Sequence, residues 1–332
     1  MYKPSLLVLA QCLLAACVQA HPPTVKAPAA ERVIGGTAAP ANAFPSVVTL
    51  EILSPLGVGL CGGTLLNNHT VVTAAHCVYD YDTNTYAPAS SVHVGYGSNS
   101  RLNQTIVTAV AVHVNPKFSP LDTMNDIAII TIAPIPFSAS VQPAPIYSGP
   151  LETGTALTAV GWGLTIPGGN FDTLPNNLQD TQIIVGTPDE CRKLVPTYQS
   201  SNGPQICTQN SLRPGSDTCQ GDSGTGVYIK AGGQNYLAGL TSFGAGPKGD
   251  PTCALGDGLA FYTHIYYYMP FILEYGRPVV TGPGHTAKDP KSFDRPDRPV
   301  HGHRHHRHHD HRHHGHRRHG GPAKAARPVA AT

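Results

Sequence analysis

Three short segments of the chain carry residue types that could together perform nucleophilic catalysis. His76 lies in a TAAHC segment, Asp126 in an NDIA segment and Ser223 in a GDSG segment. A serine that attacks a peptide carbonyl needs a base to take its proton, an anion to orient that base, and N–H donors where the oxyanion forms. The three residues are candidates for these parts, although an aspartate before a strand or a Gly-Asp-Ser-Gly string is also common in turns.

β-Strands would have to position most of these residues. Between Val33 and about Gly276 the chain alternates short β-type runs with Gly, Pro and Asn, which favours an all-β barrel or sandwich. The 35 Gly, 31 Pro and only 13% charged residues are likewise typical of a turn-rich β protein. Only Ile265–Tyr275 has the length and residues for a closing helix. The clearest predicted strands are 46–52, 106–114, 126–132, 155–160, 180–185, 236–243 and 258–263.

The tail, residues 277–332, differs in charge from the part before it. Residues 33–276 contain 7 Lys/Arg and 15 Asp/Glu, a net of −8. Residues 277–332 contain 12 Lys/Arg and 4 Asp/Glu, a net of +8, together with 12 of the 18 histidines. The tail is rich in Pro, His and Arg and has few apolar residues, so burial cannot offset the entropy lost on ordering it. We expect the tail to be disordered.

The first residues predict export. Lys3 precedes an apolar run, Leu6–Val18, that is too short to span a bilayer, and small residues flank Gln19. Residues 1–20 therefore predict the signal peptide of a secreted, extracellular protein. The alternatives are a buried core helix and a lipoprotein signal at the LAAC segment, which would leave Cys17 lipidated. Removal of residues 1–20 leaves six cysteines, which implies disulfides in an exported chain, with 15 pairings open.

In their order along the chain, the three segments resemble the chymotrypsin/trypsin family of serine endopeptidases. The resemblance covers residues 33 to about 276 of the 332. It includes VIGG from Val33, CGGTL from Cys61, GWG from Gly161 and TSFG from Thr241. It implies an all-β, trypsin-like fold for 33–276, with two six-stranded antiparallel β-barrels, the active site between them, and a C-terminal helix.

The resemblance also implies a role for each candidate residue. Ser223 would be the nucleophile, His76 the general base and then acid, and Asp126 the residue that orients His76. Backbone N–H groups of Gly221 and Ser223 would form the oxyanion hole, and Gly221 is a glycine because a side chain there would obstruct the substrate. Ser242 would support Asp126 and line the cleft. The implied disulfides are Cys61–Cys77, Cys191–Cys207 and Cys219–Cys253.

The start of the domain implies a precursor. Residues 21–32 would be an activation propeptide, because Arg32 immediately precedes Val33 and a cut there frees the α-amine of Val33. In the family this amine pairs with the aspartate before the catalytic serine, here Asp222, and thereby sets the oxyanion loop. A buried carboxylate needs a cation, and no Lys or Arg is near Asp222 in sequence. Since the cut follows an arginine, self-activation is one route.

Asp217 implies the substrate preference. It lies six residues before Ser223, where trypsins carry the carboxylate at the floor of the primary specificity pocket. A buried anion there favours a long cationic side chain, so we expect cleavage after Lys or Arg. The other substrate-binding residues would be Ser242, Phe243, Gly244 and Ala260. Phe243 replaces the usual tryptophan and Ala260 the usual glycine, which leaves the preference between Lys and Arg open.

We expect no cofactor and no calcium requirement. Residues 97–108, which match the calcium loop of trypsins, contain no acid, and Asp80–Asn84 lacks the glycine and the closing glutamate of a calcium loop. Asn68 and Asn103 are candidate glycosylation sites in a eukaryote. The tail could bind zinc or copper loosely, or polyanions once its histidines are charged near pH 5–6. The first of these histidines are His301, His303, His305, His306, His308 and His309.

The leading hypothesis is a secreted serine endopeptidase made as a zymogen. Its partners would be proteins with Lys or Arg at the cleavage site; we expect a monomer and no dedicated nucleic-acid site. One alternative is an inactive or catalytically minor family member that binds through its His-rich tail. Another is a metal- or heparin-type binding protein built around that tail. The presence of all three candidate catalytic residues favours the enzyme.

Overall fold

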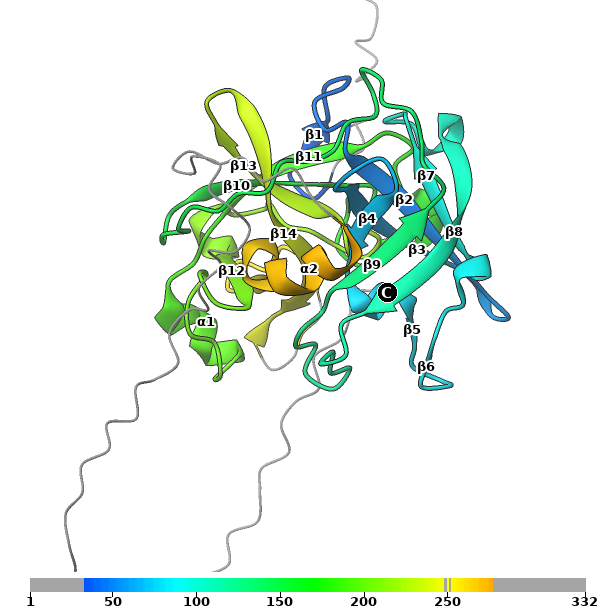
Figure 1. The fold of residues 1–332 in the computed structure, drawn as a ribbon. Helices are drawn as coiled ribbons and strands as arrows, with labels where there is room; N and C mark the ends of the chain where they lie inside the picture. Colours follow the sequence, from blue (N-terminus) through cyan, green and yellow to red (C-terminus); the bar gives the residue numbers. More distant parts are fainter. Residues whose placement is uncertain (1–32, 248–249, 251, 277–332) are drawn as a thin grey trace, which may run out of the picture. The chain divides into compact units, whose positions relative to one another are not determined.

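Short antiparallel strands are the main regular structure of the described chain (Figure 1). The computed structural model describes residues 33–247, 250 and 252–276, and these belong to one unit. The predicted signal peptide, the propeptide with Arg32, and the tail with its histidines lie outside the described residues. Among the residues described, no helix is long and apolar enough to cross a membrane.

The first half of the described chain forms a closed antiparallel barrel. Its strands are joined in the order β2-β3-β4-β9-β8-β7. Side chains that alternate along these strands, such as Leu50, Val94 and Ile130, pack in one apolar core inside the barrel. This barrel confirms the first of the two that the sequence predicts. The strands are β2 (Val47–Ser54), β3 (Gly57–Leu65), β4 (Thr70–Thr73), β7 (Val92–Tyr96), β8 (Thr105–Val114) and β9 (Ala128–Ile132).

The second half forms a seven-stranded antiparallel sheet in the order β1-β11-β10-β13-β14-β15-β12. A bridge between Val185, which follows β11, and Thr208 of β12 links the two sides of this sheet. Closure of these strands into a second six-stranded barrel stays a prediction. The strands are β1 (Thr37–Ala38), β10 (Ala156–Gly161), β11 (Gln179–Ile184), β12 (Gln205–Gln209), β13 (Gly226–Ala231), β14 (Gln234–Ala245) and β15 (Leu259–His264).

Helical elements are short. The predicted closing helix is present as a 3₁₀ turn, η7 (Ile265–Tyr268), followed by α2 (Met269–Tyr275). A second helix, α1 (Pro188–Leu194), was not predicted because it is too short to show a helical period; Thr187 caps it by accepting from the Glu190 N–H. The remaining elements are η1 (Ala75–Val78), β5 (Tyr79–Asp80), β6 (Thr85–Tyr86), η2 (Ala89–Ser91), η3 (Arg101–Asn103), η4 (Phe171–Thr173) and η5 (Asn210–Leu212).

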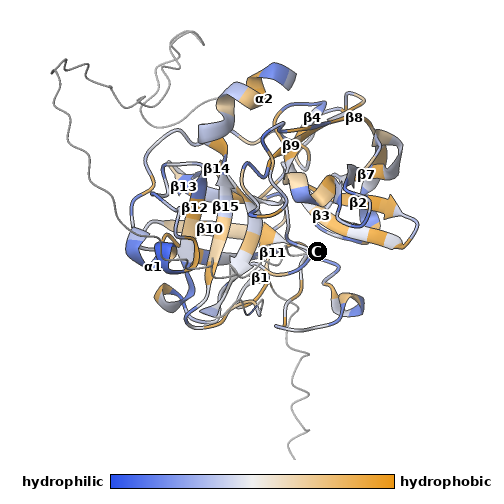
Figure 2. Ribbon diagram, turned by 90° about the horizontal axis from the view of Figure 1, so that it is seen from below, coloured by the Kyte–Doolittle hydropathy of each residue, from blue (hydrophilic) through white to orange (hydrophobic). Residues whose placement is uncertain are grey.

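One apolar cluster joins the barrel, the sheet and the closing helix. Ile127 and Ile129 come from the first half, Trp162 from the second, and Ile272 from α2. Figure 2, coloured by hydropathy, shows apolar residues along the strands and hydrophilic residues on α1. Because Ile127 follows Asp126 directly, this cluster fixes the segment that carries the candidate orienting aspartate.

Candidate active site

His76 lies in η1, directly after β4, and is buried. The small side chains of Ala74 and Ala75 let this turn pack inside the molecule, where both are buried. The neighbouring Cys77 forms a disulfide with Cys61 of β3, as predicted. The disulfide therefore attaches the histidine turn to the barrel wall. The other predicted pairs, Cys191–Cys207 and Cys219–Cys253, are also confirmed.

Asp126 holds His76 through two hydrogen bonds. The Asp126 Oδ1 atom accepts from the His76 backbone N–H at 2.9 Å, and Oδ2 lies 2.8 Å from His76 Nδ1. Ser242 of β14 donates to Oδ2 at 2.5 Å, and Thr263 of β15 donates to the Asp126 backbone carbonyl at 2.6 Å. These contacts place Nδ1–H on the aspartate, so Nε2 can take a proton.

The electrostatics of Asp126 suit the role of an orienting anion. Burial alone would raise the pKa of its carboxyl, but the charge of His76 and the hydrogen bonds from His76 and Ser242 outweigh burial and lower it. Asp126 is therefore ionised at neutral pH.

The described residues contain one group of potential metal ligands, made up of Cys61, His76 and Cys77. The two cysteines are joined in a disulfide, so neither has a thiolate to offer a metal.

The loop that carries Ser223 is anchored to the same elements. The Ser223 carbonyl accepts from Gly62 N–H at 2.8 Å, and Gly62 adjoins the Cys61–Cys77 disulfide beside His76. Gly224 N–H donates to the Thr241 carbonyl at 2.8 Å, next to Ser242. The structure therefore brings the Ser223 segment to the His76–Asp126–Ser242 group, and Ser223 itself is buried.

Gly221 has a conformation that requires glycine. Its φ of +95° lies in the left-handed region, and a Cβ there would come within 3.0 Å of the Gly163 Cα. The turn is closed by the Asp222 N–H, which donates to the Cys219 carbonyl at 3.0 Å. This tight turn holds the loop of the predicted oxyanion hole.

Asp222 is a buried carboxylate with neutral partners in the described part of the chain. Its oxygens accept from the Gly163 N–H at 2.7 Å and the Cys219 N–H at 2.9 Å. Burial raises the pKa of Asp222 to about 7. A Cβ on Gly161 or Gly163 would overlap this carboxyl group, at 2.0 Å and 2.5 Å. The GWG segment therefore has glycines because the Asp222 side chain lies against its backbone.

The start of the domain packs beside the predicted specificity residue. Val33 is buried, and the Ile34 carbonyl accepts from the Asp217 N–H at 3.3 Å. Gly35 has a φ of +72°, and a Cβ there would lie 2.0 Å from the Gly215 carbonyl oxygen. The VIGG segment is thus inserted against the loop that carries Asp217.

Asp217 is buried and accepts three hydrogen bonds from described residues. The donors are the Thr218 N–H at 2.8 Å, the Ala254 N–H at 2.8 Å and the Asn210 side-chain amide at 2.9 Å. Burial raises the pKa of the Asp217 carboxyl although these three bonds lower it. Asn210 was missed by the sequence analysis, because it belongs to no motif and reaches Asp217 only through the fold.

The other predicted substrate-binding residues lie on β14 and β15, which are paired. Phe243 stacks on Phe261, with ring centroids 4.8 Å apart. Ala260 is buried, and Gly244 is exposed opposite it on the neighbouring strand. Of the candidate glycosylation sites, Asn103 is exposed and Asn68 half-buried.

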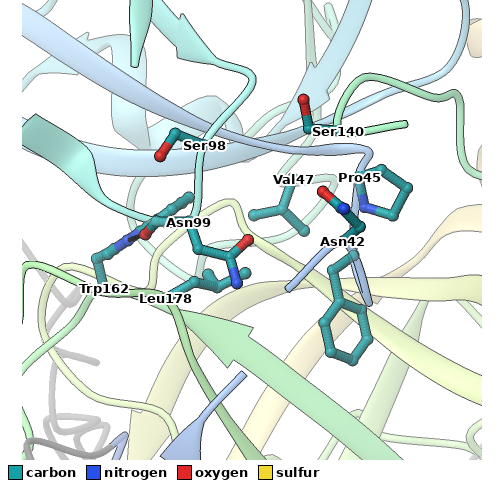
Figure 3. A pocket seen from close by; sticks show the side chains of 9 residues that line it. Asn42, Pro45, Val47, Ser98, Asn99, Ser140, Trp162 and Leu178 are labelled. Atoms are coloured by element: carbon teal, nitrogen blue, oxygen red, sulfur yellow. Dashed lines mark hydrogen bonds between the residues drawn. The ribbon is translucent and has the colours of Figure 1, made fainter. Parts of the chain in front are cut away.

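A small pocket is lined by none of the predicted site residues (Figure 3). Trp162 Nε1 donates to the Asn99 carbonyl at 2.8 Å in its wall. Trp162 is also the residue between Gly161 and Gly163, the two glycines that lie against Asp222. One wall of the pocket therefore belongs to the segment that packs on the Asp222 side chain. Its lining residues are Asn42, Phe44, Pro45, Val47, Ser98, Asn99, Ser140, Trp162 and Leu178.

Comparison with known proteins agrees with this geometry. The family model described as Trypsin matches residues 33–272. Trypsin II-P29 of Gallus gallus is 31% identical over 74% of this chain and 89% of its own length. Trypsin-1 of Astacus astacus is 30% identical over 72% of this chain and 98% of its own length. Serine protease 1 of Rattus norvegicus is 30% identical over 73% of this chain and 89% of its own length. The chain belongs to the trypsin family and is a serine endopeptidase.

Proposed function

We propose that this protein is a secreted endopeptidase that cuts after Arg or Lys and is made as a zymogen activated by cleavage after Arg32. The observation that carries the substrate preference is Asp217, a buried carboxylate whose described partners are all neutral N–H groups. A cationic substrate side chain would supply the missing counter-charge. A substrate without one would leave the buried charge unpaired.

The proposed catalytic sequence uses His76 Nε2 as the proton carrier. It takes the Ser223 Oγ proton as Oγ bonds to the peptide carbonyl carbon, and the N–H groups of Gly221 and Ser223 stabilise the oxyanion. His76 then gives that proton to the leaving amine as the C–N bond breaks. Water hydrolyses the acyl-enzyme by the same steps, and Asp126 stabilises the imidazolium in both.

The proposed activation rests on Asp222 and the buried N-terminal segment. Cleavage after Arg32 would convert the Val33 nitrogen from an amide to an ammonium. This cation would satisfy a carboxylate that otherwise has a raised pKa. The Asp222 side chain would then fix the Gly221 turn, since the two residues are adjacent.

A single set of variants tests this function. Precursor treated with trypsin should hydrolyse an arginine amide and be blocked by a serine-directed phosphonate. Asp217→Ser should lower kcat/KM for arginine and lysine substrates on the order of a thousandfold, because it removes the charge partner of the substrate. Apolar substrates should lose far less.

Arg32→Gln provides the control for activation. It should stay inactive after the same treatment, whereas Asp217→Ser should still be cut at Arg32. Equal losses on cationic and apolar substrates would show that Asp217 is structural. Absence of turnover in correctly cut wild-type protein would favour the alternative of an inactive binding protein.

A further inference from the structure

The acceptor positions of Asp217 are unequally occupied. Oδ2 accepts two hydrogen bonds, from the Asn210 amide at 2.9 Å and the Ala254 N–H at 2.8 Å. Oδ1 accepts one, from the Thr218 N–H at 2.8 Å. A carboxylate has about four lone-pair positions, two on each oxygen. Of these four positions, the one that receives no donor from the described residues is on Oδ1.

Asn210 is held firmly in this contact. It is 4% exposed at the start of η5, immediately after β12. Its backbone N–H donates to the Gly258 carbonyl at 3.1 Å, and its carbonyl accepts from the Arg213 N–H at 3.0 Å. A Cβ on Gly258 would lie 3.1 Å from the Asn210 Nδ2 atom, so a glycine leaves room for the amide. The amide must present N–H rather than oxygen, because its partner is a carboxylate.

Lysine and arginine make different demands on such a carboxylate. An ammonium is a compact charge that can use a single acceptor. A guanidinium makes its strongest contact as a fork, with one N–H to each of the two carboxylate oxygens. The fork needs a free acceptor position on both oxygens, and Asn210 fills the second position of Oδ2.

We propose that Asn210 is a specificity-determining residue that shifts the preference of this enzyme toward lysine, because its amide occupies the Asp217 position needed for a bidentate arginine. Asn210 acts through Asp217 and is a positioning residue. This inference rests on the proposed cleavage after Lys or Arg and names the preferred member of that pair.

The test is the ratio of kcat/KM for matched arginine and lysine peptides. Asn210→Ala frees the second Oδ2 position, and the arginine-to-lysine ratio should rise about tenfold, as expected for one added hydrogen bond to a charged group. Both peptides are measured on one enzyme preparation, so the ratio does not depend on the folded fraction. Gln209→Ala is the matched control, because the adjacent Gln209 amide donates to Ser211 instead, and its ratio should match wild type.

Asn210→Ser covers the case in which Asn210→Ala gives too little active enzyme. Serine keeps a polar group at this buried position, but its hydroxyl oxygen lies one bond closer to the backbone than the asparagine amide nitrogen. It therefore does not reach Asp217 Oδ2, and the ratio should again rise. An unchanged ratio in both variants, with lysine and arginine equally affected, would overturn the proposal while leaving the Lys/Arg specificity intact. Wild-type enzyme that cuts after neither residue would instead reject the proposed function.

Discussion

Three buried aspartates in this site differ in their partners. Asp126 lies beside the His76 ring and accepts from His76 and Ser242, and its pKa is lowered despite burial. Asp217 and Asp222 have N–H donors alone among the described residues, and burial raises the pKa of both. In the proposed enzyme each of these two carboxylates pairs with a cation. Asp217 pairs with the cationic side chain of the substrate, and Asp222 pairs with the Val33 amine.

His264 should make the domain less stable in acid. Its ring is buried, Nδ1 lies 2.9 Å from the Gly203 carbonyl, and Nε2 has no partner within the described ranges. Burial lowers the pKa of His264 from 6.5 to about 4. Because the folded pKa is below the unfolded one, stability is lost as pH falls from about 6.5 to about 4, by up to about 3 kcal/mol of unfolding free energy.

The measurement is the urea midpoint between pH 4 and 7, in a Ser223→Ala background that cannot digest itself. His264→Gln keeps a donor for Gly203 but cannot be charged, so its midpoint should fall less steeply with acid. Parallel curves for the two proteins would show that His264 is not the titrating group.

At the scale of elements, the turn at Gly221 should be needed for activity rather than for folding. In Gly221→Ala a methyl would meet the Gly163 backbone in a left-handed conformation, so the loop must shift. We expect kcat/KM to fall on the order of a hundredfold, with KM less affected, as for loss of an oxyanion donor.

Gly232→Ala is the matched control for this turn. Gly232 lies between β13 and β14, also has positive φ, and has nothing within 4 Å of an added Cβ. It should cost about 1 kcal/mol of stability and leave activity unchanged. Equal activity of the two variants would show that the Gly221 conformation is not required for catalysis.

The sequence predicts the individual strands better than the way in which the strands close into barrels. The seven predicted strands each match an observed strand within about two residues, because β-branched runs bounded by turn residues are local features. β1 pairs with β11 through Thr37 and Ala38 alone, too short a segment for any period to reveal. The helix α1 was not predicted for the same reason, since it has only seven residues. The Asn210–Asp217 contact could not be predicted because it is formed only by the tertiary structure.

At the scale of the whole molecule, cleavage after Arg32 should change how stability depends on pH. In the uncut chain Asp222 has a pKa of about 7, above its usual value of 3.8. Folding then favours the protonated acid, so stability falls as pH rises from about 4 to about 7, by up to about 4 kcal/mol. A Val33 ammonium beside Asp222 would lower this pKa and remove the loss.

Cut and uncut Ser223→Ala protein should therefore diverge in thermal stability from pH 5 to pH 7, with the cut form the more stable at pH 7. In Asp222→Asn the divergence should disappear, because the titrating group is gone. If the cut and uncut forms kept the same pH dependence, the Val33 amine would not pair with Asp222.

In the proposed enzyme Ser223, together with His76 and Asp126, cuts peptide bonds after Lys or Arg. The test is mass spectrometry of an unfolded protein substrate digested with activated wild-type enzyme, with Ser223→Ala treated identically. We predict new C-termini at Lys and Arg, absent from the Ser223→Ala digest. Cleavage after other residues, or the same products from Ser223→Ala, would show that Ser223 does not perform this reaction.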